Sequence, residues 1–169
     1  MKKTVDLGLF LALALICSYV ESLLPFSFGI PGIKLGLTNI VVIVMLYRMG
    51  ARSALSVSVL RIFLSGLLFG NLFSILYSLA GGLLSFVCML ILKKSRKCKV
   101  LSISAVGGVT HNLGQILMAA AVVENRNLLY YYPVMLLSGV VTGVLIGIAA
   151  QEILLRLPEQ KLRSGKEIL

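Results

Sequence analysis

Three ionisable side chains lie inside long apolar stretches of this sequence, where they could do chemistry that their hydrophobic neighbours could not. Glu21, Arg61 and His111 are each flanked by segments rich in Leu, Val, Ile and Ala. A charged side chain at the centre of a bilayer costs about 3 kcal/mol on insertion scales, so such residues normally face the interior of a helix bundle. These three residues predict a polar site enclosed by apolar helices.

Helical spacing extends this predicted site to neighbouring residues. Ser18 and Glu21, like His111 and Gln115, are three or four positions apart, which places each pair on one helical face. The same spacing joins Ser58, Arg61 and Ser65 in a third segment. We expect the substrate-binding residues to be Glu21, Lys34, Asn39, Arg61, Tyr77, His111, Asn112 and Gln115.

Lys34 lies in a glycine-punctuated turn, Pro31-Gly32-Ile33-Lys34-Leu35-Gly36, between two apolar runs. We expect this turn to form the outer rim of the site. Two cations, Lys34 and Arg61, then lie near one cavity. They suggest a small ligand with an anionic group, such as a carboxylate or a phosphate.

Each of these residues also has a purely structural interpretation. Arg61 could neutralise Glu21 in an ion pair between two helices, since buried charges are usually paired. Lys34 could be a solvated loop cation. His111, the one histidine of the chain, could be a hydrogen-bonded packing residue. The sequence leaves these alternatives open.

Composition indicates an integral membrane protein. Of the 169 residues, 59% are hydrophobic and 13% charged, whereas soluble domains have about 25% charged residues. A bilayer core of about 30 Å needs roughly 20 apolar residues per helix. We expect a single all-α domain over residues 1–169, a compact bundle of six transmembrane helices at 5–24, 35–47, 51–69, 71–92, 100–123 and 129–155. The second of these is short and could instead be a re-entrant segment.

The basic residues predict the orientation in the membrane, because Lys and Arg concentrate in cytoplasmic loops. They cluster at Lys2–Lys3, Arg48–Arg52, Lys93–Lys99 and Arg156–Lys166. Both termini of a multi-pass plasma-membrane protein are therefore expected in the cytoplasm, and the net charge of +10 does not indicate nucleic-acid binding. In this orientation the buried polar residues lie at mid-membrane or nearer the outside, as in a pocket that opens outward.

Missing motifs argue against an enzyme. Asp6 is the single aspartate, so the paired aspartate-rich motifs that hold magnesium in prenyl diphosphate synthases cannot form. There is no GxxxxGK[ST] phosphate loop and no nucleophile with an adjacent base. The three cysteines form no CxxC pair. We expect no cofactor and no metal, and binding with translocation rather than covalent chemistry.

Small residues predict close helix packing. Gly139, Gly143 and Gly147 recur at intervals of four, a pattern that lets helix backbones approach each other. We expect them to pack within the bundle. Gly8 and Ala12 have the same spacing near the cytoplasmic end of the first helix, where they could contact a separate membrane partner.

Several of these elements together resemble one known family. Glu21-x-x-x-Pro25, the GIKLG turn at 32–36, Arg61, and His111-Asn112-Leu113-Gly114-Gln115 are similar to the Gx transporter family, also labelled heptaprenyl diphosphate synthase component I. The resemblance covers nearly the whole chain. It implies a bundle similar to the S components of energy-coupling factor (ECF) transporters. These bind a small solute near the outer face and work with a transmembrane coupling subunit and cytoplasmic ATPases.

The family's second label implies an alternative role. The chain would then be a non-catalytic membrane component that associates with heptaprenyl diphosphate synthase in making the menaquinone side chain. In either role its partners include the lipid bilayer. We expect a solute-binding membrane protein first and a synthase-associated component second.

Overall fold

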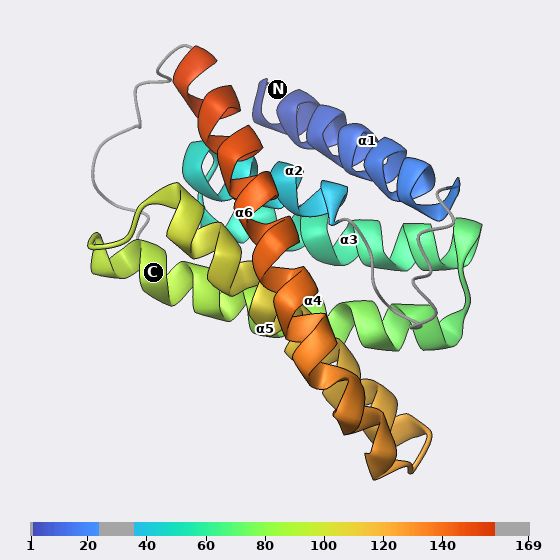
Figure 1. Ribbon diagram of the computed structural model, residues 1–169. Coiled ribbons are helices and arrows are strands. Elements are labelled where there is room, and N and C mark those ends of the chain that lie inside the picture. The colour runs from blue at the N-terminus through green and yellow to red at the C-terminus, as the bar shows by residue number, and fades with distance from the viewer. Residues whose placement is uncertain (1, 24–35, 158–169) are drawn as a thin grey trace.

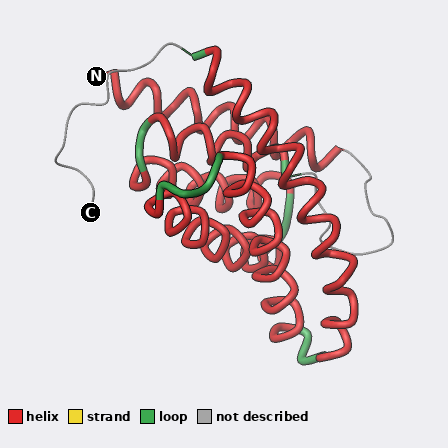
Figure 2. Tube along the Cα trace, turned by 60° about the vertical axis from the view of Figure 1, so that its left-hand side comes forward, coloured by secondary structure: helices red, strands yellow, loops and turns green. Residues whose placement is uncertain are grey.

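The computed structural model describes residues 2–23 and 36–157, and the chain is helical almost throughout them (Figures 1 and 2). No strand occurs within these ranges. Consecutive helices run in opposite directions, so the first residues of α1 and the last of α6 lie at the same end of the bundle. The helices are α1 (Lys2–Leu23), α2 (Leu37–Arg48), α3 (Ala51–Phe69), α4 (Leu72–Ser95), α5 (Val100–Val122) and α6 (Tyr132–Arg156), with a 3₁₀ helix, η1 (Arg126–Tyr131), before α6.

The expected all-α membrane fold is confirmed, and the protein is a multi-pass membrane protein. Five of the described helices are long and apolar enough to cross a bilayer. The exception, α2, has 12 residues, which span about 18 Å at 1.5 Å per residue. It covers the second expected span but only part of a hydrocarbon core of about 30 Å.

Local sequence explains several helix ends. The Asn71 side chain accepts a hydrogen bond from the Ser74 amide, and the Ser74 hydroxyl accepts one from the Asn71 amide, a capping box that starts α4. Gly36, which precedes α2, has a φ of 73°, a left-handed conformation that glycine adopts without strain. The sixth expected span, 129–155, lies within the apolar helical stretch Arg126–Arg156, which consists of η1 and α6. Pro133 occupies the first turn of α6, where its fixed φ and missing N–H favour a new helix start after η1.

Glycines bring α4, α5 and α6 into close contact. A Cβ on Gly108 would lie 2.3 Å from the Gly139 carbonyl oxygen, and one on Gly143 would lie 2.8 Å from Ala105 Cα. On the other side of α5, a Cβ on Gly114 would lie 2.7 Å from the Ala80 carbonyl oxygen. The expected packing of Gly139, Gly143 and Gly147 within the bundle is thereby confirmed, since all three face α5.

The short helix α2 lies at the centre of the apolar core. Seven of its residues are buried, from Thr38 through the run Val41–Leu46. Met45 and Leu46 have no exposed surface, and they belong to one cluster with Ala54 of α3 and Met89 of α4. By contrast α1 covers one side of the bundle, and its Gly8 has nothing within 4 Å of an added Cβ. Gly8 and Ala12 are exposed, so their contact with a partner helix stays a prediction.

The glycine contacts predict which small-to-larger substitutions the bundle tolerates. Gly114→Ala adds a methyl group against the α4 backbone, and overpacking of this kind typically costs about 1–3 kcal/mol. We expect it to lower the melting temperature of the detergent-solubilised protein by several degrees. The matched change Gly8→Ala, in open space on α1, should leave it unchanged or slightly higher, since Ala is the better helix former. Equal melting temperatures for the two variants would contradict this packing.

Candidate functional site

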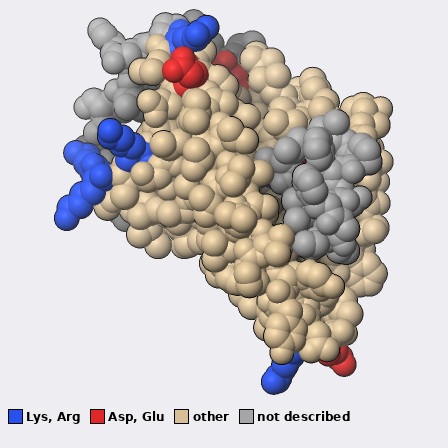
Figure 3. Space-filling view, in the orientation of Figure 1, with Lys and Arg blue, Asp and Glu red and all other residues tan. Residues whose placement is uncertain are grey.

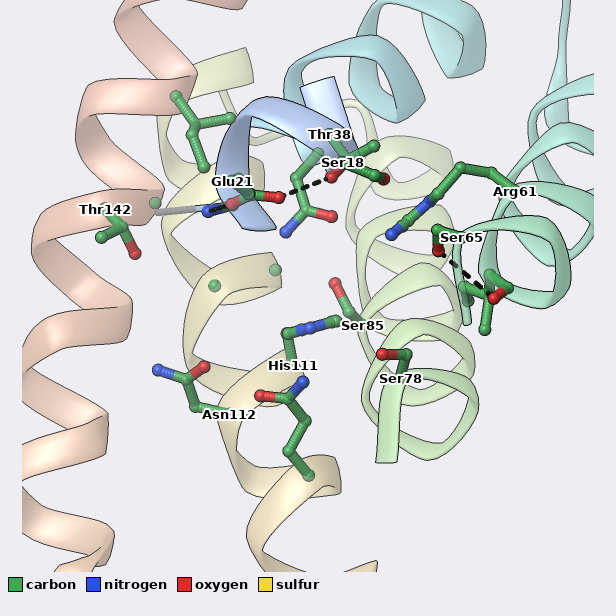
Figure 4. Close-up of a pocket in the computed structure, with 18 of the residues that line it drawn as sticks. Ser18, Glu21, Thr38, Arg61, Ser65, Ser78, Ser85, His111, Asn112 and Thr142 are labelled. Atoms are coloured by element: carbon green, nitrogen blue, oxygen red, sulfur yellow. Dashed lines mark hydrogen bonds between the residues drawn. The ribbon is translucent and has the colours of Figure 1, made fainter. Parts of the chain in front are cut away.

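A cavity of about 400 Å³ lies inside the bundle and is lined by residues of all six α-helices. Its volume falls at the lower end of the range for small-molecule pockets, about 300–1,000 Å³. The lining is rich in hydroxyl, amide and charged groups although the bundle is apolar. Figure 4 shows Glu21, Arg61, Ser85 and His111 around one common space, although they come from four different helices.

Glu21 of α1 holds the first turn of α2. Its Oε1 accepts hydrogen bonds from the amides of Gly36 and Leu37, the latter at 3.0 Å. Its Oε2 accepts one from the Thr38 hydroxyl at 2.9 Å. A helix N-terminus carries unpaired amides and a partial positive charge. The Glu21 carboxylate accepts hydrogen bonds from these amides and places a negative charge beside the positive end of α2. Glu21 therefore acts as an N-terminal cap supplied by another helix.

The other end of α2 is held by a charge of the opposite sign. The Lys93 ammonium of α4 donates a hydrogen bond to the Leu46 carbonyl oxygen and lies 4.8 Å from the centre of the Tyr47 ring. A cation near the last carbonyls of a helix complements its dipole. Two neighbouring helices thus fix the position of α2, whose Gly36, Thr38, Asn39 and Ile43 line the cavity.

Arg61 of α3 extends toward the cavity (Figure 4). Its Nε is buried and has no hydrogen-bond partner among the described residues. The structural alternative of an ion pair predicts an Arg61 nitrogen within 4 Å of a Glu21 oxygen. Between these two described residues no such ion pair exists. The Glu21 carboxylate is instead bonded to α2.

The polar residues of α5 divide into two roles. The Asn112 side-chain amide donates to the Met135 carbonyl oxygen at 2.7 Å and to the Ser138 hydroxyl at 3.3 Å, so it fastens α5 to α6. His111 and Gln115 also line the cavity. The close approach of α4 to α5 helps to position His111 and Gln115. Gly81 of α4 packs on the His111 carbonyl oxygen and the Gln115 side chain.

Further hydroxyl groups in the cavity lack partners. The Oγ atoms of Ser18, Ser85 and Ser104 are buried and have no hydrogen-bond partner within the described ranges. All three residues line the cavity. Buried polar groups in proteins are almost always hydrogen-bonded, so these hydroxyls are suited to bind water or a polar solute. Of the three, Ser18 was indicated in the sequence by its spacing of three residues from Glu21.

The cavity brings most of the expected site residues together. Six of them line it: Glu21, Asn39, Arg61, His111, Asn112 and Gln115. Tyr77 is not among the lining residues. The hydroxyl residues of α4 that line the cavity are Ser74, Ser78 and Ser85. Lys34 and the turn at 31–35 lie outside the described residues. Whether any of these side chains contacts a substrate stays a prediction.

Sequence reasoning did not select four hydroxyl residues that line the cavity, Ser22, Thr38, Ser78 and Thr142. Thr38 follows the glycine turn, but its role depends on Glu21, which is distant in sequence. Ser78 is one residue beyond the expected Tyr77. The Thr142 hydroxyl donates to the Ser138 carbonyl oxygen of its own helix at 2.8 Å, a common arrangement that carries no signal of function.

The chemistry that this arrangement supports is binding. One guanidinium, several hydroxyls and amides converge on the space, and such groups recognise polar or anionic parts of a small molecule. Across residues 2–23 and 36–157 no group of three His, Cys, Asp or Glu side chains could hold a metal ion.

Comparison with known proteins gives one match. The model of the family described as heptaprenyl diphosphate synthase component I matches residues 10–153, a range that contains every residue lining the cavity. Neither a curated protein nor a solved structure matches the chain at a significant level.

The geometry around Glu21 predicts a specific loss of stability. Glu21→Ala removes the acceptor of three hydrogen bonds, and hydrogen bonds to a charged group contribute about 1.5–3 kcal/mol each at most. We expect a destabilisation of about 2–3 kcal/mol and faster hydrogen exchange in peptides that cover the first turn of α2. Glu21→Gln keeps one acceptor oxygen and should lose less.

A suitable control is Glu152→Ala on α6. Glu152 forms an exposed ion pair with Arg156 at 3.8 Å, and exposed pairs contribute about 0–1 kcal/mol. This variant should melt like the wild type and leave exchange in α2 unchanged. If Glu21→Ala behaved like Glu152→Ala, the capping role of Glu21 would be wrong.

Proposed function

This chain belongs to the heptaprenyl diphosphate synthase component I family, and we propose that it is a membrane-embedded protein that binds and transports a small polar solute. One observation carries this proposal: a cavity of about 400 Å³ inside an apolar helix bundle, lined in part by hydroxyl, amide and charged side chains. A membrane protein with a purely structural role could fill its interior with apolar side chains and would not need a cavity with polar groups. Buried hydroxyls and the buried Arg61 Nε, which have no hydrogen-bond partner among the described residues, are costly unless a solute or water binds them.

The proposed orientation places both termini in the cytoplasm. Exposed cations gather at the junction of α4 and α5, where Lys94, Arg96, Lys97 and Lys99 follow one another. Figure 3 shows Lys and Arg at the ends of the molecule and an uncharged surface between them, as expected for a lipid-facing belt. With the basic junction in the cytoplasm, Glu21 near the end of α1 lies toward the outer side. The cavity would then receive its solute from outside, with α2 serving as a short sixth span.

Energy for transport would come from other proteins. The chain has no phosphate-binding loop, so ATP hydrolysis would require partners such as the coupling subunit and cytoplasmic ATPases of ECF transporters. The exposed small residues Gly8 and Ala12 of α1 are a candidate contact for the coupling subunit. We propose no catalytic step for this chain.

The name of the family supports a second function, a non-catalytic component associated with heptaprenyl diphosphate synthase. The two functions separate in one experiment on the purified protein. A synthase component should co-elute with a soluble prenyltransferase and raise its rate. A solute-binding protein should instead retain a small molecule through purification in detergent.

Two serines of α3 provide a matched test of solute binding. Ser65 and Ser56 each donate a hydrogen bond to a carbonyl oxygen of their own helix. Ser65 lines the cavity, whereas Ser56 is exposed and does not. Leucine at position 65 would project into the cavity, and leucine at position 56 would face lipid.

By native mass spectrometry we expect the wild type and Ser56→Leu to carry the same bound small molecule, and Ser65→Leu to lose most of it. Both variants should elute as single species and melt near the wild-type temperature. A wild-type protein without any bound small molecule, or equal retention by both variants, would count against the proposed function.

A further inference from the structure

No described residue forms an ion pair with Arg61. Its Nε is buried without a hydrogen-bond partner among the described residues, and its side chain points toward the cavity from α3 (Figure 4). Burying a charge is costly unless it is paired. We therefore expect a negatively charged group beside the Arg61 guanidinium.

The Glu21 carboxylate attracts the Arg61 guanidinium at a distance but makes its hydrogen bonds to the start of α2 instead. Both of its oxygens accept hydrogen bonds from the start of α2, where the Leu37 amide and the Thr38 hydroxyl lie 3.0 Å and 2.9 Å away. The positive end of the α2 dipole already compensates this carboxylate. No ion pair links Glu21 to Arg61.

No other acidic residue is available to Arg61 from the lining of the cavity. The whole chain has six Asp and Glu residues, and Glu21 is the single one among the described lining residues. Residues 24–35 contain no acidic residue. Glu152 forms its ion pair with Arg156. Within the described residues no carboxylate forms an ion pair with Arg61, which leaves a bound anion as a source of negative charge.

A second set of groups indicates what else that molecule carries. The hydroxyls of Ser85 on α4 and Ser104 on α5 are both buried, 2% exposed, and lack partners in the described part of the chain. They line the cavity together with the apolar side chains of Met89 and Ile146. A hydroxyl can both donate and accept a hydrogen bond without adding charge, so these serines suit an uncharged polar group.

We propose that the solute is a small monocarboxylate whose carboxylate pairs with Arg61 and whose uncharged hydroxyl, carbonyl or amide groups bind Ser85 and Ser104. This inference rests on the proposed solute-binding function and specifies its substrate class. A guanidinium pairs with a carboxylate through two parallel hydrogen bonds. A phosphate monoester carries a charge of about −1.5 to −2 at pH 7, more than the one described cation of the lining can neutralise.

The test identifies the acidic group on the molecule that the protein retains. Protein purified in detergent is denatured, the released small molecules are coupled to ethanolamine with a carbodiimide, and the products are weighed by mass spectrometry. Each carboxyl group adds one ethanolamine by forming an amide with loss of water. We expect the principal released molecule to add one ethanolamine and to contain no phosphorus.

Three variants connect this molecule to Arg61. Arg61→Gln removes the charge and should reduce the retained amount at least tenfold. Arg61→Lys keeps the charge without the paired geometry and should retain an intermediate amount. Arg126→Gln, on the exposed η1, changes a cation outside the cavity and should retain the wild-type amount.

A released molecule that is neutral, cationic or phosphorylated would overturn the inference but leave solute binding intact. Equal retention by Arg61→Gln and the wild type would also overturn it. Release of no small molecule from the wild type would overturn the proposed function itself. The ethanolamine result on the wild type does not depend on the folding of any variant.

Discussion

The hydrogen bonds from the first turn of α2 to Glu21 are the interaction on which this site depends. A helix that begins within an apolar bundle has amides for which its own turns provide no partner. Glu21 accepts from two of these amides and from the Thr38 hydroxyl. Because the carboxylate is used in this way, α2 can begin beside the cavity and Glu21 forms no ion pair with Arg61. One acidic side chain thus determines both the shape and the electrostatics of the site.

The surrounding helices support this arrangement in different ways. Backbone contact at Gly108, Gly114 and Gly143 fixes α5 against its two neighbours, and the Asn112 amide bonds α5 to the α6 backbone. These contacts give His111 and Gln115 defined positions on one wall. On the opposite wall α1 and α3 contribute Glu21 and Arg61. The cavity therefore lies between the closely packed helices α4, α5 and α6 and a side formed by α1 and α3, where Glu21 bonds to the start of α2.

Much of the fold could be predicted from sequence because it follows from local patterns. Apolar length located every helix, and α3 spans 51–69 as expected. The boundary of α4 was less accurate, since the expected span ended before Lys93, whereas the helix continues to Ser95. Lysine has a high helix propensity although its side chain is polar. The hydrogen bond from Lys93 to the Leu46 carbonyl oxygen is a tertiary contact that periodicity does not reveal.

The lining of the cavity was predictable where it follows helical spacing and unpredictable where it depends on rotation or on distant contacts. The spacing placed Arg61 and His111 on interior faces. On α4 the cavity receives Ser78 and not the adjacent Tyr77, a difference of one residue or about 100° around the helix axis. The bond between Glu21 and Thr38 joins residues 17 positions apart, and only the fold shows that it replaces an ion pair with Arg61.

The central claim, that the bundle encloses a solute whose negative charge pairs with Arg61, is tested most directly by an experimental structure of the protein purified without added ligand. The account predicts density that the chain does not explain beside the Arg61 guanidinium, extending toward Ser85 and Ser104, with Glu21 bonded to the start of α2. A structure in which Arg61 pairs directly with Glu21 and side chains fill the interior would contradict it.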